Sequence, residues 1–109
     1  MGYNLFLDDL RDVDSRDCVT TTCGYDFVVA RSSAEATALL TQYGVPDRLA
    51  LDHDLGDDDT ALVYLRVLAD TLLLCPATPT PEYTIHSANP VGRNNIHAFM
   101  TSLHRVRGV

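Results

Sequence analysis

Four short apolar runs in this chain each lead directly into polar residues. The runs cover residues 5–7, 27–30, 49–51 and 83–85, and the residues that follow them are Asp8-Asp9, Arg31-Ser32, Asp52-His53-Asp54 and His86-Ser87. Apolar runs of this length are typical of buried strands. If the strands are parallel, their carboxyl ends meet at one edge of one sheet, which is where open α/β sheets bind ligands. The pattern therefore predicts a site built from all four strand ends.

Helical patterns alternate with these runs. Ser32 stands three residues before Glu35, the spacing of a capping box, and Gly44 and Pro46 indicate where that helix stops. A second apolar stripe is formed by Ala61, Leu65, Leu68 and Leu72. A third stripe is formed by Ile96, Phe99, Met100 and Leu103, with Asn94 or Asn95 expected to cap its helix.

Strands that alternate with helices indicate right-handed βαβ units. We expect one α/β domain over residues 1–109, a three-layer parallel sheet with strand order 2-1-3-4 and helices on both faces. In this order the first and third strands are neighbours, so Asp8 and Asp9 lie beside Asp52. Residues 10–26 lack a clear pattern, and we expect them to be irregular or to contain a short helix.

Composition narrows the range of partners. There are 15 acidic and 8 basic residues, for a net charge of -7, and a surface of this sign disfavours general nucleic-acid binding. No apolar stretch is long enough for a membrane span. Cys18, Cys23 and Cys75 lack zinc-knuckle spacing and follow no leader peptide, so we expect reduced thiols in a soluble, cytoplasmic protein, with Cys75 in the core.

The clustered carboxylates indicate a metal site. Asp8, Asp9 and Asp52, with Asp54 next, would repel one another at a partly buried edge unless a cation offset their charge. Mg²⁺ (or Mn²⁺) prefers oxygen ligands and often bridges carboxylates to a substrate phosphate. The alternative is that Asp8 and Asp54 are turn or capping residues and that Asp9 pairs with Arg11.

Two histidines and three arginines surround the predicted metal site. His53 and His86 stand at strand ends, and two imidazoles facing each other across a phosphoryl group could act as acid and base. The alternative for each is a hydrogen-bonded core histidine. The loop from His86 to Arg93 leads into a helix, and its backbone donors could hold an anion. The candidate phosphate-binding residues are Arg31, Arg93, Ser87, Asn89 and, as a further possibility, Arg11.

These motifs resemble the cyclic-phosphate processing receiver domains, a group related to response-regulator receivers. The matching stretches are Leu7-Asp8-Asp9-Leu10-Arg11, Val29-Ala30-Arg31-Ser32, Leu51-Asp52-His53-Asp54-Leu55-Gly56 and His86-Ser87-Ala88-Asn89-Pro90-Val91-Gly92. The resemblance implies a flavodoxin-like fold and a proposed role on cyclic phosphates. It also implies that the working site contains Asp8, Asp9, Asp52, His53, Asp54, His86, Ser87 and Asn89. Thr60-Ala61 departs from the pattern, which has a glycine at the start of that helix.

The leading hypothesis is a metal-assisted phosphoesterase that acts on a cyclic phosphate of a nucleotide, a nucleotide derivative or an RNA end. Asp52 could be either a metal ligand or a nucleophile. The first alternative is a non-enzymatic module that binds a phosphorylated ligand or a protein through the same edge. The second is a signalling receiver phosphorylated on Asp52, which is disfavoured because receivers use a lysine and this chain has none.

Overall fold

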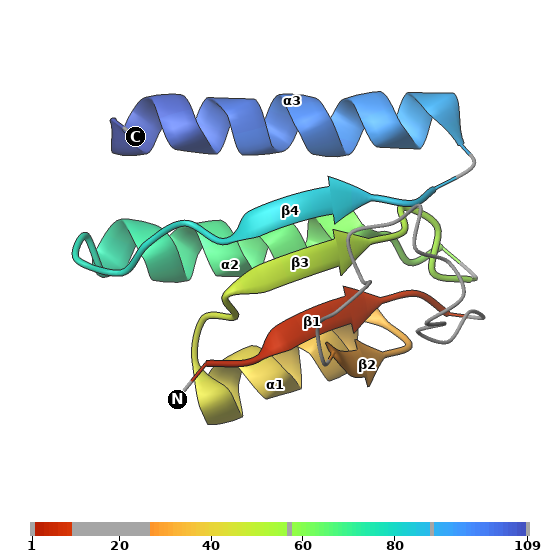
Figure 1. Cartoon of the computed structure of the whole chain (residues 1–109). Helices are drawn as coiled ribbons and strands as arrows, with labels where there is room; N and C mark the ends of the chain where they lie inside the picture. Colours follow the sequence, from red (N-terminus) through yellow and green to blue (C-terminus); the bar gives the residue numbers. More distant parts are fainter. Residues whose placement is uncertain (1, 10–26, 57, 88, 109) are drawn as a thin grey trace.

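The described residues form a parallel sheet of four strands (Figure 1). The computed structural model describes residues 2–9, 27–56, 58–87 and 89–108. The strands are β1 (Asn4–Leu7), β2 (Phe27–Ala30), β3 (Arg48–Leu51) and β4 (Glu82–Ile85). Their order is β2-β1-β3-β4, and every neighbouring pair is parallel. The α/β class and the strand order predicted from the sequence are confirmed.

The register of the strands determines which side chains meet at the carboxyl edge. Leu7 on β1 pairs with Leu51 on β3, and Leu51 pairs with Ile85 on β4. The ladder continues beyond the strands, because the Asp52 N–H donates to the Leu7 carbonyl at 2.9 Å and the His86 N–H donates to the Leu51 carbonyl at 2.9 Å. Asp8, Asp52 and His86 therefore follow the strands in adjacent positions. Side chains alternate along a strand, so these three share the sheet face of Phe6.

Three helices pack together on the other face of the sheet. They are α1 (Ser33–Tyr43), α2 (Ala61–Leu74) and α3 (Pro90–Arg107). In Figure 1, α1 and α2 lie behind the sheet and α3 runs alongside β4. Buried residues of all three helices belong to one hydrophobic cluster, which also contains Leu5 and Leu7 of β1 and Leu49 and Leu51 of β3. This cluster is the hydrophobic core between the helices and the sheet, and it packs against the strands that lead into the carboxyl edge of the sheet.

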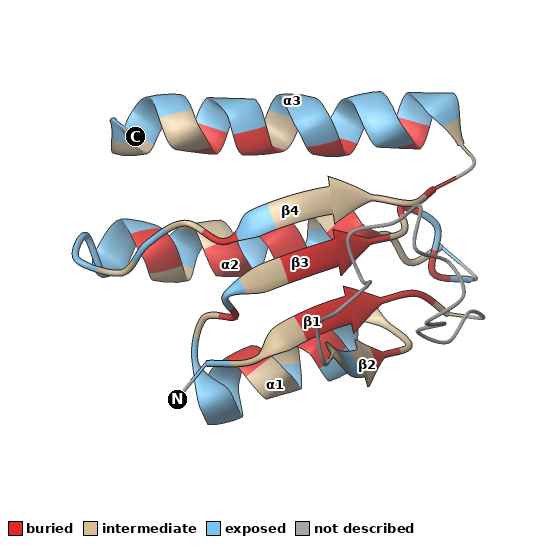
Figure 2. Cartoon of the chain, in the orientation of Figure 1, coloured by how far each residue is buried: buried red, intermediate tan, exposed pale blue. Residues whose placement is uncertain are grey.

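The apolar stripes predicted for α2 and α3 point into this core (Figure 2). All four predicted residues of α2 are fully buried: Ala61, Leu65, Leu68 and Leu72. In α3, Ile96, Met100 and Leu103 are buried, and Phe99 packs against the cluster. The spacing of the apolar residues therefore predicted the inward faces correctly, because residues three or four positions apart lie on the same side of a helix.

The face of the sheet opposite the helices is also buried. Phe6 is 5% exposed and Ala50 is 1% exposed, although neither belongs to the core cluster on the helix side. Residues 10–26, where we expected an irregular crossover or a short helix, lie outside the described residues. The three described helices confirm one of the two predicted layers.

The helix boundaries follow local capping chemistry. Ser32 caps α1 as predicted, since its hydroxyl accepts the Glu35 N–H at 3.1 Å. The predicted start of α3 is wrong by five or six residues, because Asn89 caps that helix and Pro90 occupies its first turn, where a missing N–H costs nothing. Cys75 is exposed rather than buried, since it follows the last buried turn of α2.

None of the helices in the described part of the chain is both long enough and apolar enough to cross a membrane.

Candidate functional site

Three carboxylates meet at the carboxyl edge of the sheet. One ligand oxygen from each of Asp8, Asp9 and Asp52 lies within 4.8 Å of the others. Asp8 is buried, with 1% of its surface exposed, whereas Asp9 and Asp52 are partly exposed. Asp8 and Asp9 follow β1 and Asp52 follows β3, so the pairing of these two strands creates the cluster. The structure thus brings together three of the four predicted metal ligands.

The environment of the cluster shifts the pKa of Asp52. Burial, followed by the negative charge of Asp8, raises the pKa of the Asp52 carboxyl above its usual value of 3.8. A hydrogen bond from the Ser87 hydroxyl, the charge of His86 and the His53 N–H each lower that pKa without cancelling the rise. The cluster therefore holds negative charge at a cost in free energy that a bound cation would reduce.

His86 joins the cluster from the end of β4. Its Nε2 donates to Asp8 Oδ2 at 3.0 Å, and the side chains are 11% and 1% exposed, respectively. The imidazole also stacks on the ring of Phe6, with the ring planes 9° apart. An imidazole, the side chain most often used for proton transfer in catalysis, is thereby held beside the carboxylates.

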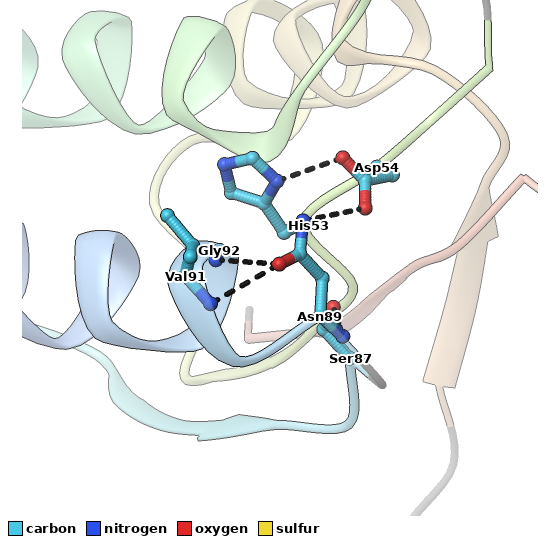
Figure 3. A network of polar contacts seen from close by, with 6 residues as sticks. All are labelled: His53, Asp54, Ser87, Asn89, Val91 and Gly92. Carbon is cyan, nitrogen blue, oxygen red and sulfur yellow. Dashed lines mark hydrogen bonds and ion pairs between the residues drawn. The ribbon is translucent and has the colours of Figure 1, made fainter.

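Asp54 lies in a different network, which joins the end of β3 to the start of α3 (Figure 3). Its Oδ1 accepts a hydrogen bond from His53 Nδ1 at 2.9 Å, and its Oδ2 accepts one from Asn89 Nδ2 at 3.1 Å. These two bonds lower the pKa of the Asp54 carboxyl. Asp54 is absent from the group of clustered ligand oxygens among the described residues. The structure therefore does not place this predicted metal ligand with the other three.

His53 is packed against α3 rather than facing His86. A Cβ added to Gly92 would lie 2.4 Å from His53 Cγ, so the imidazole occupies the space that a side chain at position 92 would take (Figure 3). Only 8% of His53 is exposed. Because it follows Asp52 directly, its side chain points toward the helix side of the sheet, and that of His86 points toward the Phe6 side. The structure does not bring the two imidazoles together.

Arg31 is the arginine that lies beside the acidic cluster. Its Nη1 donates to the Asp8 carbonyl at 3.3 Å, and its side chain is partly exposed. Arg93 is exposed on α3, where its Nη1 donates to the carbonyls of Ile85 and Ser87, each at 3.4 Å. Arg11, the third predicted phosphate-binding arginine, lies outside the described residues. Arg31 is therefore the best placed of the described arginines to contact a ligand at the cluster.

Ser87 and Asn89 organise the loop between β4 and α3. Ser87 is buried, and its hydroxyl accepts the Asn89 N–H at 3.1 Å while donating to Asp52. Asn89 Oδ1 accepts the N–H groups of Val91 and Gly92 at 3.1 and 3.2 Å (Figure 3). Three of the backbone donors that we expected to hold an anion are thus satisfied by the loop's own side chains. Ser87 remains in contact with the cluster through Asp52.

Comparison with known proteins identifies the family. The family model for the cyclic-phosphate processing receiver domain matches residues 3–102. The chain belongs to this family. The receiver-like domain is also similar to a solved structure, described as a yeast Spc42 trimeric coiled-coil segment fused to another structure, with 13% sequence identity and a TM-score of 0.59. That match covers 97% of this chain and 78% of the other, and at this identity it supports the fold alone. Comparison with curated protein sequences finds no match.

Two features of this receiver-like domain were missed by sequence reasoning. Gly56 has a φ of +83°, and a Cβ there would lie 3.2 Å from Asp9 Oδ2, so the loop after β3 passes close to the cluster. Asp59, which precedes α2 in the chain, accepts hydrogen bonds from the backbone N–H of Ser33 at 2.8 Å and its hydroxyl at 2.5 Å. The glycine was a visible turn signal, whereas nothing local linked Asp59 to α1.

Proposed function

We propose that this receiver-like domain is a metal-assisted phosphoesterase that opens or removes a cyclic phosphate on a nucleotide, a nucleotide derivative or an RNA end. The observation that carries the proposal is the convergence of Asp8, Asp9 and Asp52 within 4.8 Å, with His86 hydrogen-bonded to Asp8. Membership of a cyclic-phosphate processing family supports the choice of substrate.

The donor set fits a hard divalent cation. It consists of carboxylate oxygens, which Mg²⁺ and Mn²⁺ prefer over the nitrogen and sulfur ligands of softer metals. The raised pKa of Asp52 supports this fit, because it is caused first by burial and then by the charge of Asp8, and a bound cation would offset both effects. Asp8, Asp9 and Asp52 would hold the ion. When bound, Mg²⁺ or Mn²⁺ would polarise the phosphoryl group and activate water.

In the proposed reaction a water oxygen bonds to phosphorus and one phosphorus–oxygen ester bond breaks. The departing sugar oxygen needs a proton, and the attacking water must lose one, so the reaction is balanced by one water molecule. His86 is the group in position to carry a proton, since its imidazole is held beside the cluster by Asp8. Ser87 keeps the Asp52 carboxylate oriented through their hydrogen bond.

Arg31 is assigned to the phosphate oxygens in this proposal. A guanidinium presents several donors in a fixed plane and stabilises charge that develops on those oxygens. His53 and Asp54 are assigned to holding the loop that carries Ser87, because they contact Asn89 and Gly92 rather than the cluster. The reaction as proposed therefore needs one histidine rather than two.

The test is turnover of 2′,3′-cyclic nucleotides and linear nucleotide monophosphates with Mg²⁺ or Mn²⁺, followed by ³¹P NMR. We expect the wild type to open the cyclic phosphate and His86→Ala to be slower by about 10²–10⁴-fold, the usual contribution of a general acid or base. The matched control is His97→Ala, which removes an exposed histidine of α3 whose ring is hydrogen-bonded to Tyr83 of β4.

The same assay separates the alternatives. Equal turnover by wild type and His86→Ala removes His86 from the mechanism. Tight binding of a cyclic nucleotide without turnover identifies a binding module instead. A base-labile phosphoryl adduct on Asp52 after treatment with a small phosphodonor, again without turnover, identifies a phosphorylated receiver.

A further inference from the structure

Phe6 makes an aromatic contact with His86 across the middle of the sheet. The two ring centroids are 4.8 Å apart and the planes differ by 9°, which is a stacked arrangement. Phe6 is 5% exposed, so its ring packs among surrounding atoms, and close packing limits the movement of a buried side chain. The contact therefore gives the imidazole a rigid surface on one side.

Strand β3 lies between the strands of Phe6 and His86, and its small side chain at this position leaves space for the contact. Phe6 pairs with Ala50 on β3, and Ala50 pairs with Thr84 on β4. Because β1 and β4 are separated by two strand spacings, or about 10 Å, the His86 side chain has to reach across β3. Ala50 has only a methyl group on this face, so the imidazole can pass over it.

We propose that Phe6 is a positioning residue for His86. A histidine side chain has two rotatable bonds, and two contacts restrain them here: the stack on Phe6 sets the plane of the ring, and the hydrogen bond to Asp8 sets its direction. The importance of this placement for turnover rests on the proposed function of His86. The placement itself does not.

The test compares Phe6→Leu with Phe27→Leu. Phe27 lies on the same face and meets Phe6 edge-on, with centroids 6.3 Å apart and planes at 78°, so it is a matched aromatic without the stacked contact. The first readout is the ¹⁵N NMR signals of the His86 ring nitrogens, which report the hydrogen bond between Nε2 and Asp8 and are assigned by their loss in His86→Ala. We expect Phe6→Leu to move the Nε2 signal away from its wild-type position, because the imidazole is then no longer held in the direction of Asp8. Phe27→Leu and the conservative variant Phe6→Tyr should retain the wild-type position.

The second readout is the kinetics of the proposed reaction. We expect Phe6→Leu to lower kcat by on the order of 10- to 100-fold with little change in KM, the scale expected for a misplaced catalytic group. Phe6→Tyr should restore kcat, and Phe27→Leu should leave it unchanged. If Phe6→Leu does not fold, Phe6→Met provides the same comparison, because a flexible thioether fills irregular space.

The outcomes that overturn the positioning role differ from the outcome that overturns the proposed function. Unchanged His86 ring signals in Phe6→Leu overturn the positioning role, and so do changed signals with unchanged kcat in an active enzyme. A wild type that turns over no cyclic phosphate overturns the proposed function. The NMR comparison then decides alone whether Phe6 places the imidazole.

Discussion

Replacing Asp52 with asparagine should stabilise the domain when no divalent cation is present. The pKa of Asp52 is raised on balance, so burial and the charge of Asp8 outweigh the hydrogen bonds and the attraction of His86 that favour ionised Asp52. An asparagine removes the charge and keeps an oxygen that can accept the Ser87 hydrogen bond. The variant thus loses a repulsion while retaining most of the local structure.

The size of the effect follows from the geometry of the cluster. Two unit charges at the 4.8 Å limit repel by about 3 kcal/mol at an effective dielectric constant of 20 and by about 1 kcal/mol in water. Asp52 is partly exposed, and solvent screening brings the value toward the lower limit. We expect Asp52→Asn to raise the free energy of unfolding by about 1–2 kcal/mol, and Tm by about 4–8 °C for a domain of this size.

The pH dependence has a defined sign. Unfolded Asp52 ionises near its ordinary pKa, whereas folded Asp52 keeps its proton to higher pH, so the contribution of Asp52 to stability falls as pH rises between those two values. Below pH of about 3 the residue is protonated in both states. The advantage of Asp52→Asn should therefore be full at neutral pH and nearly absent at low pH.

The assay is urea or thermal unfolding in a chelator, repeated with Mg²⁺. A cation that binds the folded state stabilises it by mass action, so Mg²⁺ should raise the Tm of the wild type more than that of Asp52→Asn. Asp58→Asn, an exposed acid in the loop after β3, is the control for a general change in net charge. An Asp52→Asn variant that is less stable than wild type in chelator at neutral pH, or an equal effect of Mg²⁺ on both proteins, refutes the reasoning.

Two further predictions concern the fold. Tyr64→Phe should leave stability unchanged or raise it by up to about 1 kcal/mol in urea unfolding, because the Tyr64 hydroxyl is buried without a hydrogen-bond partner in the described structure. A loss of more than about 1 kcal/mol would reveal a partner for that hydroxyl. Gly92→Ala should lower stability by about 1–3 kcal/mol, since its Cβ would lie 2.4 Å from His53 Cγ, whereas equal stability would show that His53 moves without penalty.

The secondary structure was predicted well because its signals are local. The start of α1 is set by capping at Ser32 and Glu35, and its end is set by the backbone conformation of Gly44. Both effects involve neighbours in the chain. The stripe from Ala61 to Leu72 identified the buried side of α2 because the helical period is a property of the segment itself. The start of α3 was misplaced because several asparagines can cap a helix, and Asn89 with Pro90 was the pair that did so.

The roles of the two histidines could not be separated in the same way. His53 and His86 both follow apolar strands, and each is next to a polar residue. Alternation along a strand places the His53 side chain on the opposite face from its neighbour Asp52, but the sequence does not say which face meets helices. The close approach of His53 to Gly92 and the stack of His86 on Phe6 involve residues 39 and 80 positions apart in the chain.

The amino-acid sequence by itself determined the order of strands and helices, the inward helix faces and the gathering of acids at strand ends. These depend on short-range periodicity and on the rule that parallel strands end at one edge. Only the tertiary structure decided that Asp8, Asp9 and Asp52 form the cluster, that Asp54 and His53 hold the start of α3, and that Phe6 lies against His86. The physical reason is that strand register and helix packing, which set these distances, arise from contacts between segments far apart in the chain.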